Sequence, residues 1–152
     1  MKVLLLYYSY TGNTEKLALG IKERIEKKIN VNTIKVEPER DISYLSKCMY
    51  SLLGRTLPVR NQFIDESYDC VVMGFPVWAF SPSAYFNSML NLFTTQGKCI
   101  LFCSFEDSGA KRTLKIAQKR AEARGLKVVY AEAFKEGEDY EEKLKTLTNV
   151  IK

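Results

Sequence analysis

The stretch that decides the fold is residues 3–14, VLLLYYSYTGNT. Its first six residues are apolar without interruption, which is typical of a β-strand buried on both faces in a parallel sheet. The strand ends at a turn of hydroxyl side chains and Gly12. Residues 14–29 then predict a helix, because an apolar side chain recurs every four positions. These side chains are Leu17, Ile21, Ile25 and Ile29. The stretch therefore predicts a strand, a turn and a helix in direct succession.

The same succession repeats along the rest of the chain. Further apolar runs predict strands at residues 31–37, 69–73, 98–105 and 126–134. Helical periodicity follows each strand in turn, at residues 44–53, 83–93, 110–124 and 140–151. Regular alternation of strands and helices predicts an α/β fold of three layers, in which a five-stranded parallel sheet carries helices on both faces. The first of the four runs alternates in polarity, which predicts an edge strand, and the length predicts one domain over residues 1–152.

Composition excludes several classes of protein. The chain has 152 residues, of which 46% are hydrophobic, and it contains no His. The absence of His excludes a Ser-His-Asp triad, a Cys-His pair and a His-ligated metal. The four Cys form no C-x-x-C motif, and we interpret them as reduced thiols of the core. No apolar run approaches the roughly 18 residues of a membrane span, and no signal peptide is evident. We therefore expect a cytoplasmic protein with no membrane partner and no metal.

The first predicted strand is followed by the most informative loop. In open α/β sheets, ligands bind beyond the carboxyl ends of the strands, where the strand order reverses. Backbone N–H groups and the helix dipole can hold a phosphate at such a place, and hydroxyl side chains can add donors. The loop contains no Lys, and neither a Walker motif nor G-x-G-x-x-G occurs in the chain. The alternative interpretation is a turn with a Thr cap. The candidate phosphate-binding residues are Ser9, Tyr10, Thr11, Gly12, Asn13 and Thr14.

This S-x-T-G-x-T loop, after the first strand of a five-stranded α/β chain, resembles the phosphate loop of the flavodoxins. The resemblance covers the whole chain. It implies the strand order 2-1-3-4-5, a non-covalently bound FMN as cofactor and the FMN phosphate on this loop. Its specificity lies mainly in this loop and in the loop after the third strand.

The loop after the third strand is residues 74–82, GFPVWAFSP, and it carries Trp78, the only Trp. An aromatic side chain can stack on the planar flavin ring, and in flavodoxins this loop commonly supplies one. The alternative is a Trp that covers the core. Many flavodoxins have Gly after this aromatic, and its peptide flips to hydrogen-bond the half-reduced flavin. Ala79 stands here, and a positive φ is costly without Gly, so the resemblance is weakest at this point. The candidate residues are Pro76, Val77, Trp78, Ala79 and Phe80.

A third loop follows the fourth strand and by its position would meet the pyrimidine edge of the flavin. Phe105 could cover the second face of the ring, or it could be the last core residue of its strand. The neighbouring acids could be ordinary helix-start residues, or they could disfavour an anionic reduced flavin. The candidate residues are Ser104, Phe105, Glu106 and Gly109.

Two other classes of protein with a similar architecture are excluded, because the chain lacks the residues that they require. A response-regulator receiver needs acids after the first strand and an Asp after the third, where this chain has Tyr-Tyr-Ser and Met-Gly-Phe. A small tyrosine phosphatase needs C-x5-R, and the nearest match, Cys48 to Arg55, is C-x6-R.

The two leading functions are an electron carrier between a reductase and a client enzyme, and an NAD(P)H-dependent reductase of quinones or flavins. A third possibility is an interaction module without cofactor. The short chain favours the carrier. Ala79 favours the reductase, as do residues 41–64, which could cover a site with Tyr44, Tyr50 and Phe63.

The net charge of +5 is concentrated in residues 111–127, with seven cations against one acid. We interpret this segment as a cationic, solvated helix face. It lacks the interleaved aromatics of a nucleic-acid site, so we expect no nucleic-acid partner. Flavodoxins are typically acidic, so this chain should favour acidic partners or need none.

Overall fold

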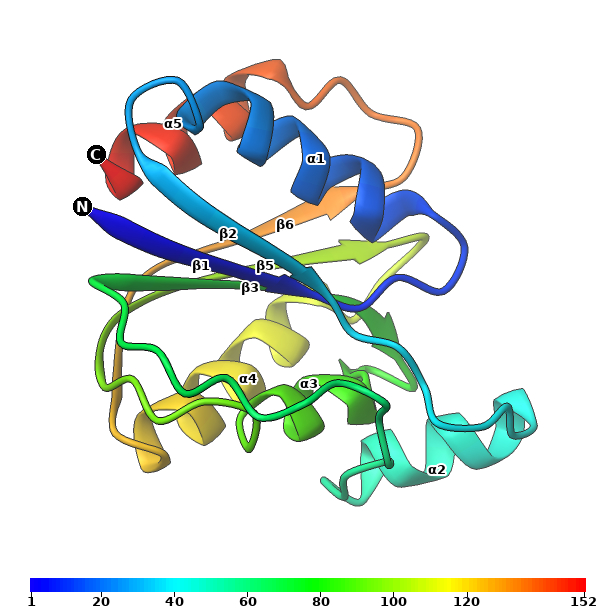
Figure 1. The fold of residues 1–152 in the computed structure, drawn as a ribbon. Coiled ribbons are helices and arrows are strands. Elements are labelled where there is room, and N and C mark those ends of the chain that lie inside the picture. The colour runs from blue at the N-terminus through cyan, green and yellow to red at the C-terminus, as the bar shows by residue number, and fades with distance from the viewer.

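A computed structural model describes all of residues 1–152 and shows a sheet between two layers of helices (Figure 1). The main strands are parallel and lie in the order β2-β1-β3-β5-β6. Their bounds are β1 Lys2–Tyr7, β2 Asn30–Lys35, β3 Cys70–Trp78, β5 Gly97–Phe105 and β6 Leu126–Lys135. Counted without the short β4, this is the predicted order 2-1-3-4-5, and β2 is an edge strand as predicted.

Five helices cover the sheet. Helices α1 and α5 lie on one face, and α3 and α4 lie on the other, with α2 at the periphery of that second layer (Figure 1). Their bounds are α1 Asn13–Ile25, α2 Tyr44–Leu52, α3 Ala84–Met89, α4 Ala110–Ala123 and α5 Glu141–Ile151. None of them combines the length and apolar character needed to cross a membrane.

Alternate residues of the central strands supply two separate cores. In β1, Leu4 and Leu6 belong to the core beneath α3 and α4, whereas Val3 and Leu5 belong to the core beneath α1 and α5. All four side chains are fully buried. Continuous apolar runs in these strands therefore reflect burial on both faces of the sheet, as the sequence predicts.

The structure differs from the prediction around residues 74–93. β3 continues through Trp78 and folds back through a two-residue turn into β4 (Ser81–Pro82), which pairs antiparallel with it. Helix α3 is shorter than the predicted 83–93, although Phe93 beyond its end is still buried. Helix α1 likewise ends at Ile25 rather than at residue 29.

Helix α2 presents its predicted apolar face to solvent. The residues that it buries are Lys47 and Ser51. Ser51 Oγ accepts a hydrogen bond from the Ala84 N–H and donates one to the Lys47 carbonyl, and Lys47 Nζ lies 3.0 Å from a carboxylate oxygen of Asp41. Because these polar groups are all paired, burying them is tolerated.

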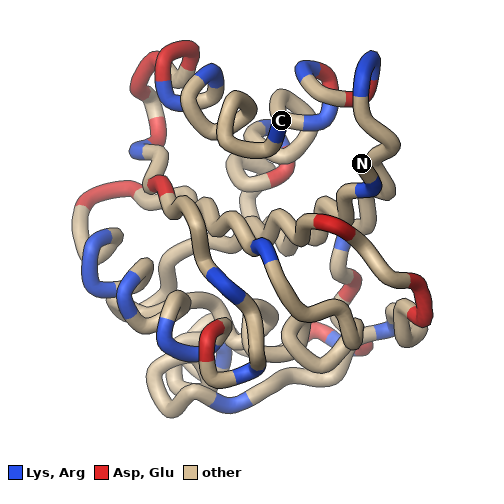
Figure 2. Tube along the Cα trace, turned by 90° about the vertical axis from the view of Figure 1, so that its left-hand side faces the viewer, with Lys and Arg blue, Asp and Glu red and all other residues tan.

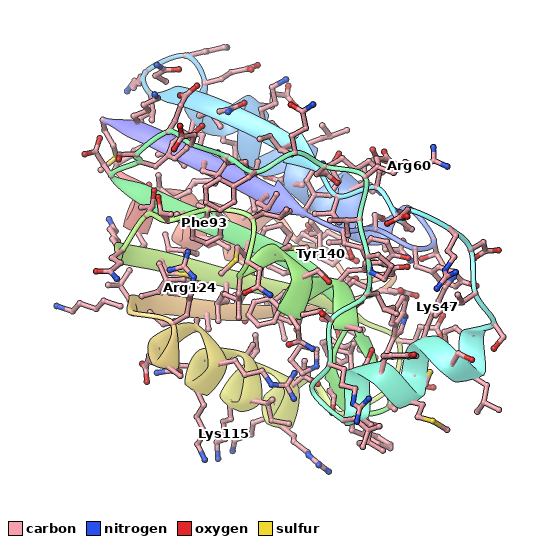
Figure 3. All side chains as sticks on the ribbon, turned by 60° about the horizontal axis from the view of Figure 1, so that its bottom comes forward. Lys47, Arg60, Phe93, Lys115, Arg124 and Tyr140 are labelled. Atoms are coloured by element: carbon pink, nitrogen blue, oxygen red, sulfur yellow. The ribbon has the colours of Figure 1, made fainter.

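The cationic segment 111–127 is only partly a solvated face. Arg124 donates hydrogen bonds to the carbonyls of Leu90, Phe93 and Thr95, and its guanidinium lies 4.7 Å from the centre of the Phe93 ring. In Figure 3, Arg124 turns towards Phe93, whereas Lys115 points away from the fold. The basic residues on other helices and loops (Figure 2) are balanced by acids, so the net excess of positive charge stays in this segment.

We predict that Arg124→Gln lowers the free energy of unfolding by about 2–3 kcal/mol, because three carbonyls lose a charged donor. Urea unfolding followed by circular dichroism measures this. Lys119→Gln, on an exposed side chain of the same helix, should change stability by less than about 0.5 kcal/mol. Equal effects of the two substitutions would contradict a structural role for Arg124.

Candidate functional site

The three predicted loops meet at one cavity of about 540 Å³, at the carboxyl ends of β1, β3 and β5. Ten of the predicted residues line it: Tyr10, Thr11, Pro76, Val77, Trp78, Ala79, Phe80, Ser104, Phe105 and Glu106. Ser9, Gly12, Asn13, Thr14 and Gly109 lie in the same loops but do not line it. The lining also includes Asp107 and Ser108 of the third predicted loop, Tyr44 from the segment that the sequence indicates as a cover, and Glu136, which the prediction missed.

The loop after β1 leaves several backbone donors free at the N-terminus of α1. Gly12 has φ 98° and starts the helix, and the Ser9 hydroxyl accepts the N–H groups of Gly12 and Glu15 at 3.1 and 3.2 Å. Between Tyr10 and Thr14, the N–H groups that donate to no protein acceptor are those of Tyr10, Thr11, Asn13 and Thr14. A Cβ at Gly12 would meet no atom within 4 Å, so the space beside this loop is open. Free N–H groups at the positive end of a helix dipole favour an anion.

A hydroxyl pair joins this loop to the third loop. The Thr14 and Ser104 hydroxyl oxygens are 2.8 Å apart, and both side chains are buried. The contact fixes the start of α1 against the end of β5. Either hydroxyl can be the donor, so the pair leaves one proton for a further acceptor.

Trp78 is 3% exposed and lies within a cluster of tyrosines. The rings of Tyr8, Tyr10, Tyr44 and Tyr85 meet it edge-on, at centroid distances from 5.5 to 6.1 Å. Tyr10 and Tyr44 stack on each other at 5.7 Å and remain about half exposed. The aromatic surface open to the cavity is therefore mainly that of these two rings and the half-exposed Phe80, whereas Trp78 borders the cavity from within the buried core.

Tyr44 is a lining residue that comes from a distant part of the chain. Burial, followed by its neighbour Cys48, raises the pKa of Tyr44 to about 12, so its phenol is neutral at physiological pH. The sequence offers Tyr44, Tyr50 and Phe63 equally as covers for a site. Of these three, only Tyr44 lines this cavity, and Tyr50 borders a separate hollow.

Three carboxylates line one side of the cavity, those of Glu106, Asp107 and Glu136. Burial raises the pKa of Glu136, and the charges of Glu106 and Asp107 add to the effect. No Lys or Arg lines the cavity, and the nearby Lys47 is buried with its Nζ 4.6 Å from the centre of the Tyr10 ring. The cavity therefore has a negative side, opposite in sign to the net charge of the chain.

The turn between β3 and β4 is strained. Ala79 and Phe80 have φ of 50° and 58°, although neither is Gly. A two-residue hairpin turn with positive φ at both positions normally contains Asn-Gly. Ala79 thus adopts a positive φ, the conformation that the sequence predicts to be costly for a residue other than Gly. Phe80 packs on Gly109, where a Cβ would come within 2.5 Å of the Phe80 ring.

We predict that Ala79→Gly raises the free energy of unfolding by about 0.5–1 kcal/mol. Glycine removes a left-handed strain of about 1–2 kcal/mol and adds a smaller loss of backbone entropy. Chemical denaturation measures the change. The matched control is Ala123→Gly at the end of α4, which should lower stability. A loss of stability from Ala79→Gly would contradict the strained turn.

The chain is thus a parallel α/β protein with its cavity where the strand order reverses. The family model for flavodoxins matches residues 2–146, and the chain belongs to the flavodoxin family. No curated protein sequence matches the chain at a significant level.

Several solved structures share the fold. A flavoprotein from Lactobacillus acidophilus NCFM, in complex with FMN, is 22% identical with a TM-score of 0.71, over 97% of this chain and 98% of that one. A flavodoxin from the domain Archaea is 19% identical with a TM-score of 0.64, over 99% and 96% of the two chains. A flavone reductase is 13% identical with a TM-score of 0.64, over 99% of this chain and 60% of its own.

Proposed function

We propose that this protein binds FMN non-covalently in the cavity and uses it to carry electrons between redox partners. The observation that carries the proposal is the set of four free backbone N–H groups at the start of α1, beside a cavity lined by aromatic rings. Membership of the flavodoxin family supports it, as does the FMN complex of the similar Lactobacillus flavoprotein. A volume of about 540 Å³ lies in the range of small-molecule sites.

Each loop has a separate part in holding the cofactor. Residues Ser9–Thr14 would bind the phosphate through backbone N–H groups and hydroxyls. Trp78, Tyr10, Tyr44, Phe80 and Phe105 would pack against the ring and exclude water from it. Backbone groups of Ser104–Glu106 would meet its polar edge. The flavin itself would supply the electron-transfer chemistry.

The carboxylates of the cavity would act on the reduced cofactor through their charge. A negative charge on the flavin would be opposed by Glu106, Asp107 and Glu136, at distances set by the loops after β5 and β6. Since no cation lines the cavity, nothing there offsets this repulsion. The protein would therefore disfavour the anionic reduced cofactor.

We predict that Gly12→Val raises the dissociation constant for FMN at least about 100-fold. A branched side chain would be strained at φ 98° and would occupy the open space beside the free N–H groups. Quenching of FMN fluorescence measures binding.

The matched control is Gly97→Val, because Gly97 also has a positive φ and open space but lies at the start of β5. This variant should bind FMN as the parent does. A folded Gly12→Val protein with unchanged affinity would contradict the phosphate site, and purified parent protein that stays colourless with added FMN would contradict the whole proposal.

The alternative function is an NAD(P)H-dependent reductase of quinones or flavins. The half-exposed rings of Tyr10, Tyr44 and Phe80 favour it, because they offer a planar second substrate an apolar surface at the cavity mouth. The carrier remains the leading proposal because the connections between the strands, apart from the α2 segment, contain no insertion that could build a pocket for a second substrate.

Stepwise reduction with dithionite distinguishes the two functions. For a carrier we expect two separate one-electron steps and slow oxidation of NADPH in the presence of a quinone. A reductase would show a single two-electron step and would oxidise one NADPH for each quinone reduced to hydroquinone. The second result would replace the carrier by the reductase.

A further inference from the structure

Helix α2 carries an unusual share of the exposed apolar surface. Half of the large apolar side chains that the protein exposes lie on this helix or directly after it. They are Tyr44, Leu45, Met49, Tyr50, Leu52 and Leu53. Leu45 is 76% exposed and Leu53 is 61% exposed. A contiguous patch of this kind, on the order of 500 Å², is at the upper end of what monomers expose and indicates a contact surface.

The patch is ordered as a stripe along the helix. Leu45, Met49 and Leu52 follow each other at steps of four and three residues, which places them on one side. Lys47, the one charged residue of α2, is turned inwards and buried. A surface helix normally places its charges towards solvent. This helix has the opposite arrangement, so its outer face is suited to contact with protein rather than with water.

We propose that two copies of this chain associate by antiparallel packing of their α2 helices across a two-fold axis. The stripe is self-complementary in this arrangement, because Met49 lies at its middle and meets Met49 of the other copy, while Leu45 meets Leu52. A two-fold interface requires such a surface, since the same patch serves both partners.

Charges at the two ends of α2 favour the antiparallel direction. The exposed residues before the helix include the acids Glu39 and Asp41, with Arg40 between them. At the other end Arg55 is exposed, and Arg120 reaches the C-terminal end of the helix from α4. Because Asp41 is paired with Lys47, the charges at the start of the helix balance, whereas its end is positive. Antiparallel packing keeps the two positive ends apart, and parallel packing would place them side by side.

The cationic helix α4 supports the same direction. The C-terminal end of α2 points towards α4 (Figure 1), whose exposed cations include Lys111, Arg112, Lys115 and Lys119. Antiparallel packing places the α4 helices of the two copies at opposite ends of the interface. Parallel packing would place them side by side with like charges opposed.

The outer face of α2 suits a second copy better than an anionic lipid surface. Membrane-binding helices carry Lys and Arg beside their apolar face, whereas the exposed residues of α2 itself include none. A standard interface buries about 800 Å² on each partner, so this patch and its charged ends suit a dimer of modest affinity.

The oligomeric state of the purified protein tests the proposal, with and without FMN. Sedimentation velocity from 1 to 100 µM should show a species of twice the 17.5 kDa chain mass. Leu52→Glu should raise the dimer dissociation constant at least about 30-fold. Leu19→Glu is the matched control, because Leu19 is a half-exposed leucine on α1 and its substitution should leave the dimer intact. Circular dichroism verifies that both variants are folded.

A cross-link tests the direction of packing. In a Cys48→Ser background, a mixture of Leu45→Cys and Leu52→Cys proteins should form a mixed disulfide-linked dimer with oxidised glutathione, whereas a mixture of Leu45→Cys and Leu19→Cys proteins should not. Parallel packing would instead link each of the first two variants to itself. A monomer throughout the concentration range, or a dimer that survives Leu52→Glu, would overturn the proposal. So would a monomer that sediments with phosphatidylglycerol vesicles and loses this binding in Leu52→Glu. Dimerisation is measured without flavin, so failure of FMN binding would not affect this result.

Discussion

Burial of β1 between β2 and β3 is the constraint on which the site depends. β1 pairs in parallel with both neighbours, and its residues from Val3 to Tyr8 are buried. After β1 the chain adds β2 on one side of it and then crosses to add β3 on the other side. Because β1 and β3 are parallel neighbours, the loops that follow them lie at the same edge of the sheet. The cavity follows from this reversal, because no helix can cover both loops where the chain changes direction. The chemistry of the site is then decided by the few residues at the strand ends.

The two sides of the cavity have opposite electrostatic character. The start of α1 presents free N–H groups to an anion, whereas Glu106, Asp107 and Glu136 present negative charge. A ligand that suits both sides has an anionic group at one end and a neutral, planar body at the other. The neutral phenol of Tyr44 and the rings around Trp78 fit that second part. This division agrees with the proposed binding of FMN and gives the basic chain an acidic site.

The strands, the edge strand and most of the core follow from hydrophobic patterning, because burial on both faces leaves uninterrupted apolar runs in β1 and β5. The strand order, in contrast, follows from the resemblance to flavodoxins and not from the patterning. Ten of the fifteen candidate site residues line the cavity, because the carboxyl ends of parallel strands lie at the same edge of the sheet. The β3–β4 hairpin was not predicted, because Ala79-Phe80 lacks the Asn-Gly signal of such a turn. The orientation of α2 was not predicted either. Periodicity shows that a helix has an apolar side but not whether the core or another molecule covers it. Glu136 comes from the loop after β6, and only the folded sheet brings it to the site.

The packing of Phe80 on Gly109 links the cavity to the cationic helix. Phe80 forms part of the cavity wall, and Gly109 is the residue from which α4 starts. The gap between them has no room for an added methyl group. A ligand in the cavity therefore cannot push the half-exposed Phe80 ring towards the start of α4. The absence of a side chain at Gly109 thus fixes how far this wall of the cavity can recede, so the width of the site is set in part by the residue from which α4 starts.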